Sequence, residues 1–257
     1  MSHPVQSRRE GAVRWLTFDN VAKHNALTLE MNQGLIAGLE AFAAADDERV
    51  LVLAGAGDKA FMSGADISEF EGDEERVAAF GRDTLRMMRT LRDLPKPTVA
   101  MIRGYCIGGG LALASACDLR IAASDASFAI PAARLGVGYS GEFTSLLIDL
   151  VGASATKEIL FTARRYDADE AHGMGLINRV VLPAELEAFT RDYCATMAEN
   201  APLTLRAAKI VVAELLSGGH VDGSPGHRAI AACAESEDFR NAPRAFLEKR
   251  KPVFTGR

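Results

Sequence analysis

The stretch Pro97–Ala122, PTVAMIRGYCIGGGLALASACDLRIA, decides the fold because it sets a strand, a glycine turn and a helix in succession. The apolar run Thr98–Ile102 predicts a strand, and Gly108–Gly110 open an Ala/Leu-rich segment with helical character. The first N–H groups of a helix have no intrahelical partner, and glycine lets another group approach them closely. The stretch therefore indicates either tight helix–strand packing or a site that stabilises a negatively charged oxygen.

Strands and helices alternate on both sides of this stretch. The expected strands are Ala12–Phe18, Arg49–Ala54, Thr98–Arg103, Leu119–Ala123, Ser127–Ile130 and Leu176–Val181. The expected helices are Leu29–Ala44, Asp73–Arg92, Ala184–Asn200, Pro202–Leu216, Arg228–Asp238 and Pro243–Lys251. The alternation predicts the α/β class with crossover connections. We expect an α/β core over residues 1–182 and a helical region over residues 183–257.

Composition narrows the classes of function. The chain has 257 residues, of which 48% are hydrophobic and 25% charged, and its net charge is −5. This charge gives no electrostatic basis for binding nucleic acid or an anionic membrane surface, and no apolar run approaches the ~18 residues of a membrane span. Four scattered cysteines predict reduced thiols and a cytoplasmic location, and no Cys/His spacing predicts a metal site.

A second glycine turn lies in Phe61–Ile67, FMSGADI, which also follows a predicted strand. The turns at Ser63–Gly64 and Gly108–Gly110 would each supply one backbone N–H to the same oxygen, which is the layout of a two-donor oxyanion hole. The alternative is that both turns serve packing alone, since paired glycine turns are common in α/β folds.

Six segments of the chain resemble the crotonase (enoyl-CoA hydratase/isomerase) superfamily, in the family's order and along nearly the whole length. They are Phe18–Leu27, Phe61–Ile67, Gly104–Ile121, Phe128–Gly136, Ala168–Val181 and Phe246–Phe254. The resemblance implies a ββα-spiral core and C-terminal helices used for trimerisation, in a homotrimer or a dimer of trimers. It also implies an acyl-CoA thioester as substrate, with no cofactor besides the coenzyme A that the substrate carries.

The resemblance also assigns roles to individual residues. It implies that the backbone N–H groups of Ser63 and Gly109 form the oxyanion hole. Residues expected to bind coenzyme A are Lys23 and Ala26 beside the pantetheine and phosphates, Ala65, Asp66 and Ile67 at the adenine, and Phe246 and Lys249 at the nucleotide of a neighbouring subunit.

Two positions depart from the hydratases of this family, which move protons with two glutamates. The corresponding residues here are Ala112 and Ala132, whose methyl groups cannot transfer a proton. The resemblance suggests the label enoyl-CoA hydratase, but we do not expect efficient hydration by the usual mechanism. The segment Leu135–Glu142, LGVGYSGE, lies where the family chain passes over the acyl pocket, and it offers Tyr139 and Glu142 as chemical groups.

The leading hypothesis is therefore a lyase or isomerase that stabilises a thioester enolate and uses Tyr139 or Glu142. LGVGY also resembles methylmalonyl-CoA decarboxylase, although that enzyme's histidine and glutamate correspond to Ala65 and Ala112 here. The alternatives are a decarboxylase of this kind, an enoyl-CoA isomerase that depends on Glu142, and a non-catalytic acyl-CoA-binding homologue. In purely structural interpretations, Tyr139 is a packed aromatic ring and Glu142 an exposed carboxylate in the first turn of a helix.

Overall fold

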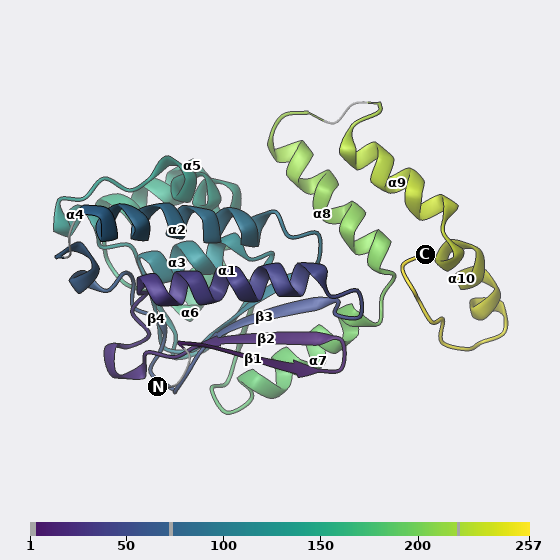
Figure 1. The fold of residues 1–257 in the computed structure, drawn as a ribbon, viewed down its shortest axis with the longest axis horizontal. Coiled ribbons are helices and arrows are strands. Elements are labelled where there is room, and N and C mark those ends of the chain that lie inside the picture. Colours follow the sequence, from purple (N-terminus) through teal and green to yellow (C-terminus); the bar gives the residue numbers. More distant parts are fainter. Residues whose placement is uncertain (1–3, 72–73, 220–221) are drawn as a thin grey trace.

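The computed structural model describes residues 4–71, 74–219 and 222–257, and shows an α/β body from which the last helices project (Figure 1). A six-stranded sheet runs in the order β1-β2-β3-β5-β7-β10. Its strands are β1 (Val5–Glu10), β2 (Val13–Phe18), β3 (Val50–Gly55), β5 (Thr98–Ile102), β7 (Leu119–Ala123) and β10 (Arg179–Val181). Neighbouring strands are parallel except for the antiparallel pair β1–β2.

A smaller sheet has the order β4-β6-β8-β9. It consists of β4 (Ala60–Met62), β6 (Tyr105–Ile107), β8 (Ser127–Ala129) and the antiparallel β9 (Tyr166–Asp167). Three successive units, β3–β4–α2, β5–β6–α3 and β7–β8–α4, each give one strand to the large sheet, one to the small sheet, and then a helix. This repeat is a ββα spiral, so the predicted α/β class and spiral core are confirmed.

Both faces of the large sheet are covered, as its near-continuous apolar strands require. On β2, Val13 and Trp15 point into a cluster with helix α7 (Leu186–Ala198), whereas Leu16 and Phe18 join the main core. The main core lies under the helices α1 (Leu29–Ala44), α2 (Glu74–Arg92), α3 (Gly109–Ala116), α4 (Ala132–Leu135), α5 (Gly141–Thr162) and α6 (Ala168–Gly173).

Local capping explains where several helices begin. The Thr28 side chain accepts a hydrogen bond from the Met31 N–H at the start of α1, and Ser140 does the same for Phe143 at the start of α5. The 3₁₀ turn η2 (Ile67–Phe70) is capped in the same way by Asp66, and a second 3₁₀ turn, η1, spans Val21–Lys23. These caps fix the chain on either side of the glycine turns.

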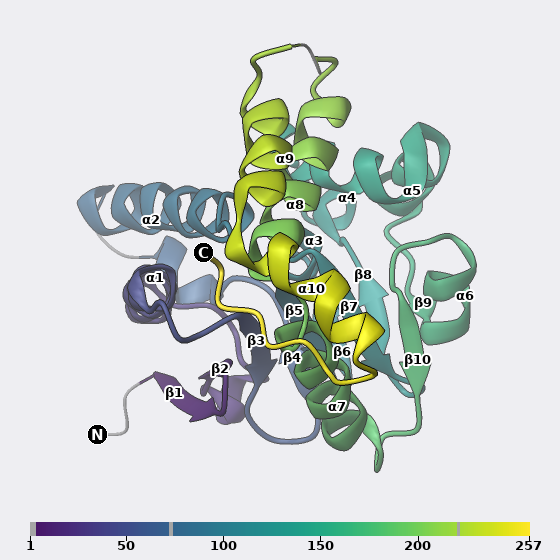
Figure 2. The same cartoon turned by 90° about the vertical axis from the view of Figure 1, so that its right-hand side faces the viewer.

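The last helices, α8 (Pro202–Leu216), α9 (Pro225–Glu235) and α10 (Glu237–Leu247), extend away from the sheets (Figure 1). The C-terminal tail returns toward the body (Figure 2), where the Arg49 guanidinium bonds to the carbonyl oxygen of Phe254. The boundary expected at residue 183 stays a prediction. Helix α7, which follows it, packs on the sheet, while α8–α10 project.

Some sequence-based boundaries were wrong. Ser236 is extended and caps α10 through the Phe239 N–H, so the helix expected over Arg228–Asp238 is divided there. Pro243 lies inside α10 rather than at the start of a helix. The strand expected at Leu176–Val181 begins only at Arg179.

Candidate active site

The two glycine turns are in contact with each other. A Cβ placed on Gly109 would lie 3.7 Å from the Ala65 nitrogen and 3.8 Å from the Gly64 Cα. A Cβ on Gly110 would lie 2.8 Å from the Met62 Cβ and closer still to the Met62 carbonyl oxygen. Real Cβ atoms do not approach other heavy atoms so closely. The glycine at position 110 is therefore what lets α3 lie directly against β4.

The donor predicted in the first turn was wrong. The Ser63 N–H donates to the carbonyl oxygen of His24 at 3.1 Å, so it has no free proton to offer. Leu27 bonds to the Gly64 carbonyl and the Asp66 N–H on either side of Ala65, both at 2.8 Å. In a parallel bridge of this kind the intervening N–H points away from the partner strand. Within the described residues the Ala65 N–H has no acceptor, so in this turn Ala65, and not Ser63, has a free N–H.

Gly109, the second donor expected from the sequence, lies at the start of α3. Gly109 is the first residue of α3, and Gly108 before it has φ +54°. The Ala112 N–H donates to the Gly108 carbonyl at 3.0 Å and closes the first turn of the helix. The N–H of Gly109 has no acceptor in the part of the chain that the structure describes, as is usual for the first N–H groups of a helix. Two unpaired donors, Ala65 and Gly109, therefore lie on touching turns at the positive end of α3.

Tyr139 carries a buried hydroxyl group. Its ring packs edge-on against Phe143, with ring centroids 5.9 Å apart, and adjoins the main core that includes Cys106 and Ala112. The hydroxyl is buried and has no hydrogen-bond partner among the described residues. Burial raises the pKa of Tyr139 well above its usual value, and the nearby Cys106 thiol raises it further. Tyr139 is thus a neutral O–H that can donate one hydrogen bond.

Glu142 is engaged on the surface. Its carboxylate accepts from Nε of Arg89 at 3.1 Å and forms a second, shorter bond to the same guanidinium. The ion pair joins the first turn of α5 to α2, and 41% of the Glu142 side chain is exposed. This arrangement matches the structural interpretation of Glu142 as an exposed carboxylate in the first turn of a helix. Because the carboxylate is paired with Arg89, Glu142 is not a free acid.

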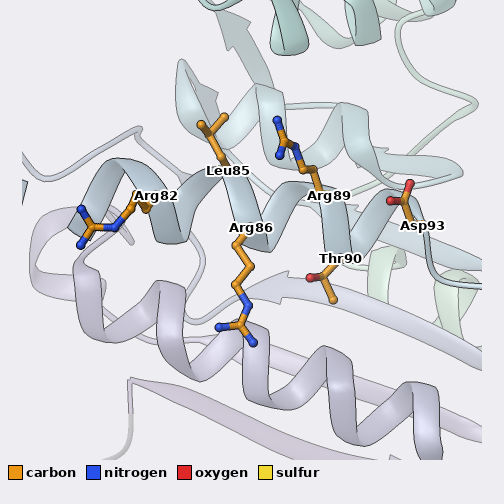
Figure 3. Close-up of a pocket in the computed structure, with 6 residues that line it drawn as sticks. All are labelled: Arg82, Leu85, Arg86, Arg89, Thr90 and Asp93. Carbon is orange, nitrogen blue, oxygen red and sulfur yellow. The ribbon is translucent and has the colours of Figure 1, made fainter. Parts of the chain in front are cut away.

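A surface groove of about 420 Å³ follows α2 and is separate from the glycine turns. Its lining residues are Arg82, Leu85, Arg86, Arg89, Thr90 and Asp93. Figure 3 shows Arg86 directed toward α1, where it pairs with Glu40, while Arg89 leaves α2 on the opposite side. Two of the three arginines of this groove, Arg86 and Arg89, therefore tie α2 to α1 and α5 through ion pairs.

The residues expected to bind coenzyme A fall into two groups, one near the first glycine turn and one at the end of α10. Lys23 donates to Asp66 at 2.6 Å, which brings the first turn and the segment after it together. This hydrogen bond from Lys23 lowers the pKa of Asp66. Ala26 is buried beside this pair and Ile67 is 71% exposed. Phe246 and Lys249 instead belong to the end of α10 and the turn after it, apart from the glycine turns in a single chain (Figure 1).

Comparison with known proteins decides the family. Residues 8–257 match the family model described as enoyl-CoA hydratase/isomerase. The chain belongs to the enoyl-CoA hydratase/isomerase family. It is 36% identical over 253 residues to a short-chain-enoyl-CoA hydratase of Clostridium acetobutylicum, covering 95% of this chain and 94% of the relative. It is 31% identical to a carnitinyl-CoA dehydratase of Salmonella typhi over the full length of both.

Solved structures give the same assignment. The crystal structure of an enoyl-CoA hydratase/carnithine racemase from Magnetospirillum magneticum superposes with a TM-score of 0.93 at 34% identity, covering 100% of this chain and 97% of that chain. An enoyl-CoA hydratase from Bacillus anthracis superposes with a TM-score of 0.90 at 31% identity, covering 99% and 100%. Within this family member, Ala112 and Ala132 contribute only methyl groups, both at the main core.

Two surveys of the described residues complete the site. No helix among them is both long and apolar enough to cross a membrane. No three His, Cys, Asp or Glu side chains among residues 4–71, 74–219 and 222–257 come together as a possible metal site. The sequence analysis did not identify the free N–H of Ala65, which results from the pairing of Leu27 with the segment around Ala65 and has no local signal in the sequence.

Proposed function

We propose that this family member is an acyl-CoA-processing enzyme of the lyase or isomerase kind that stabilises a thioester enolate. The Ala65 and Gly109 N–H groups would hold the enolate oxygen. The observation that carries the proposal is the pair of unpaired N–H groups on two touching turns at the N-terminus of α3. The relatives named as a hydratase and a dehydratase of CoA thioesters support the substrate class.

The chemistry that fits this site does not depend on a protein carboxylate. Ala112 and Ala132 cannot activate water, and the Glu142 carboxylate is held by Arg89. Loss of CO₂ from a 2-carboxyacyl thioester needs no base, because the breaking C–C bond leaves its electron pair on the thioester as an enolate. The two N–H groups then stabilise the oxygen, and a proton from solvent completes the product at the α-carbon.

Tyr139 has a defined part in this reaction. Its neutral, unpartnered hydroxyl would donate a hydrogen bond to the bound acyl group and help to hold the leaving carboxylate out of the thioester plane. A neutral donor suits this role, because it orients the carboxylate without forming an ion pair that would resist loss of charge. The isomerase alternative requires Glu142 to be free, and the Arg89 pair disfavours it.

The proposed function is tested by assaying methylmalonyl-CoA, crotonyl-CoA and a 3-enoyl-CoA with the wild type, Tyr139→Phe and Glu142→Gln. We expect CO₂ release from methylmalonyl-CoA that falls about 100-fold in Tyr139→Phe, the usual scale for losing one preorganised donor. Glu142→Gln should retain turnover within about twofold, the scale of an exposed ion pair. Fast hydration of crotonyl-CoA that neither variant affects would refute the argument from Ala112 and Ala132. Binding without any turnover would favour the non-catalytic alternative.

We also propose that three copies, or two sets of three, complete the coenzyme A site. Lys23, Ala26, Ala65, Asp66 and Ile67 would bind it from one subunit, and Phe246 and Lys249 from the next. The support is the exposure of Phe246 and Leu247, at 83% and 80%, on helices that project from the body. Light scattering coupled to gel filtration should give three or six times the 27.5 kDa chain mass, and a monomer would refute the proposal.

A further inference from the structure

Arg120 is a buried cation held by backbone carbonyl groups. It lies on β7, and its side chain is among the largest in the chain that are fully buried. Its guanidinium donates to the carbonyl oxygens of Leu176 at 2.8 Å, Cys117 at 2.7 Å and Ala114 at 3.3 Å. A buried charge normally requires a charged or strongly hydrogen-bonded partner, and here the partners are dipoles.

The neighbouring carboxylate is committed elsewhere. Asp118 accepts from the N–H and hydroxyl of Thr98 and forms an ion pair with Lys209 at 2.8 Å. Among the described residues, Arg120 forms no ion pair with any carboxylate. The Asp118 charge acts on Arg120 only from a distance, because the carboxylate bonds to Thr98 and Lys209, so the guanidinium is buried without a bonded counter-charge. In a buried setting the field of such a charge extends further than that of an exposed arginine.

The charge of Arg120 lies at the C-terminal end of helix α3. Ala114 lies in the last turn of α3, and Cys117 is the residue that caps it. Arg120 thus occupies the negative end of the helix whose first residue, Gly109, presents a free N–H. The eight residues of α3 span about 12 Å at a rise of ~1.5 Å each.

We propose that Arg120 is a positioning residue for the oxyanion hole. It fixes the C-terminal end of α3 and compensates the negative pole of the helix, so that the Gly109 N–H stabilises negative charge more strongly. This inference rests on the proposed function. A unit charge at roughly 14 Å and an effective dielectric constant of about 20 changes the stability of an enolate on the order of fivefold to tenfold.

The test separates the charge of Arg120 from its packing. Arg120→Lys keeps a cation but loses the planar set of donors, whereas Arg120→Met keeps the length of the side chain and loses the charge. Both variants should melt at lower temperature than the wild type, because buried carbonyl groups lose their partners. The probe is butyryl-CoA with ¹³C at the thioester carbonyl, whose stretching frequency falls in the bound state as the oxyanion donors polarise it.

We expect Arg120→Lys to retain most of the wild-type frequency shift and Arg120→Met to lose at least half of it. Turnover, kcat, should fall about fivefold to tenfold in Arg120→Met, with KM within about twofold. A merely structural role would lower stability in both variants without separating them in carbonyl frequency. Equal frequency shifts in Arg120→Met, Arg120→Lys and the wild type would therefore overturn the inference.

A second variant decides the question if the Arg120 variants do not fold. The Asn178 side-chain oxygen accepts from the Arg120 backbone N–H at 2.8 Å, and Asn178 is only half-buried. Asn178→Asp keeps this bond and adds a negative charge two residues after Leu176, whose carbonyl oxygen holds the guanidinium, so the carbonyl shift should shrink while the fold persists. An unchanged shift would overturn the inference. If wild-type protein gives no carbonyl shift at all, the proposed function fails instead.

Discussion

Replacing Tyr139 with phenylalanine should stabilise the unliganded protein. The hydroxyl is buried and no group in the described residues pairs with it, so folding removes it from water without compensation. An unmade hydrogen bond of this kind costs about 1–3 kcal/mol, and removing the oxygen recovers that free energy. A gain of about 2 kcal/mol corresponds to a rise in Tm of roughly 4–8 °C for a chain of this size.

Tyr166 provides a matched control. It is also buried, but its hydroxyl lies 3.5 Å from both the Thr162 hydroxyl and a Glu158 carboxylate oxygen. Tyr166→Phe should therefore lower Tm by a few degrees, since it removes both contacts of a buried hydroxyl. Both variants are compared by calorimetry and urea unfolding. If Tyr139→Phe lowers Tm as Tyr166→Phe does, the Tyr139 hydroxyl is paired in the resting protein and is not reserved for a ligand.

Two further predictions concern stability, one at Gly110 and the other at the Asp66–Lys23 pair. Gly110→Ala should lower the free energy of unfolding by about 1–3 kcal/mol, because its Cβ would lie 2.8 Å or less from atoms of Met62, whereas Gly109→Ala meets nothing nearer than 3.7 Å. Urea melts that place the two variants together would contradict this. The lowered pKa of Asp66 beside Lys23 adds stability above the unfolded carboxyl pKa of about 3.9, and this is lost as the pH falls through the lowered folded value. Wild type should therefore lose more stability than Asp66→Asn between about pH 5 and pH 2, and parallel pH curves would count against the Lys23 contact.

The four central strands of the large sheet, β2, β3, β5 and β7, were readable because they are five or six residues long and largely apolar. Val50–Gly55 and Thr98–Ile102 coincide closely with the expected strands. In the small sheet the strand expected at Ser127–Ile130 is present as Ser127–Ala129. The strand Ala60–Met62 escaped prediction because three residues are too few to show a period. The edge strand Val5–Glu10 was missed for another reason, since its sequence VQSRRE is polar and mostly exposed.

At the site, the sequence located both glycine turns but chose the wrong donor in the first. The glycines mark a close approach of two backbones, and the structure has that approach at Gly109 and Gly110. Which N–H is free depends on the pairing of Leu27 with Ala65, a contact between segments 38 residues apart that leaves no local trace. The same reason applies to Glu142, whose partner Arg89 belongs to a helix more than 50 residues earlier in the chain.

The proposed site has one half that binds the thioester oxygen and another that transfers protons, and the two halves differ in how far their residues can change. In the proposed site the oxygen-binding half would be made of main-chain N–H groups, so the side chain of Ala65 can vary while glycine at 110 cannot. The proton-transfer half would depend on side chains, and under the proposed function Ala112 and Ala132 leave it without acid or base groups while still packing at the core. Such a site would lower the energy of an enolate but would not create one by removing a proton. We therefore propose substrates whose own bond cleavage delivers the electron pair, so a carboxylated thioester tests the proposal more directly than an enoyl thioester.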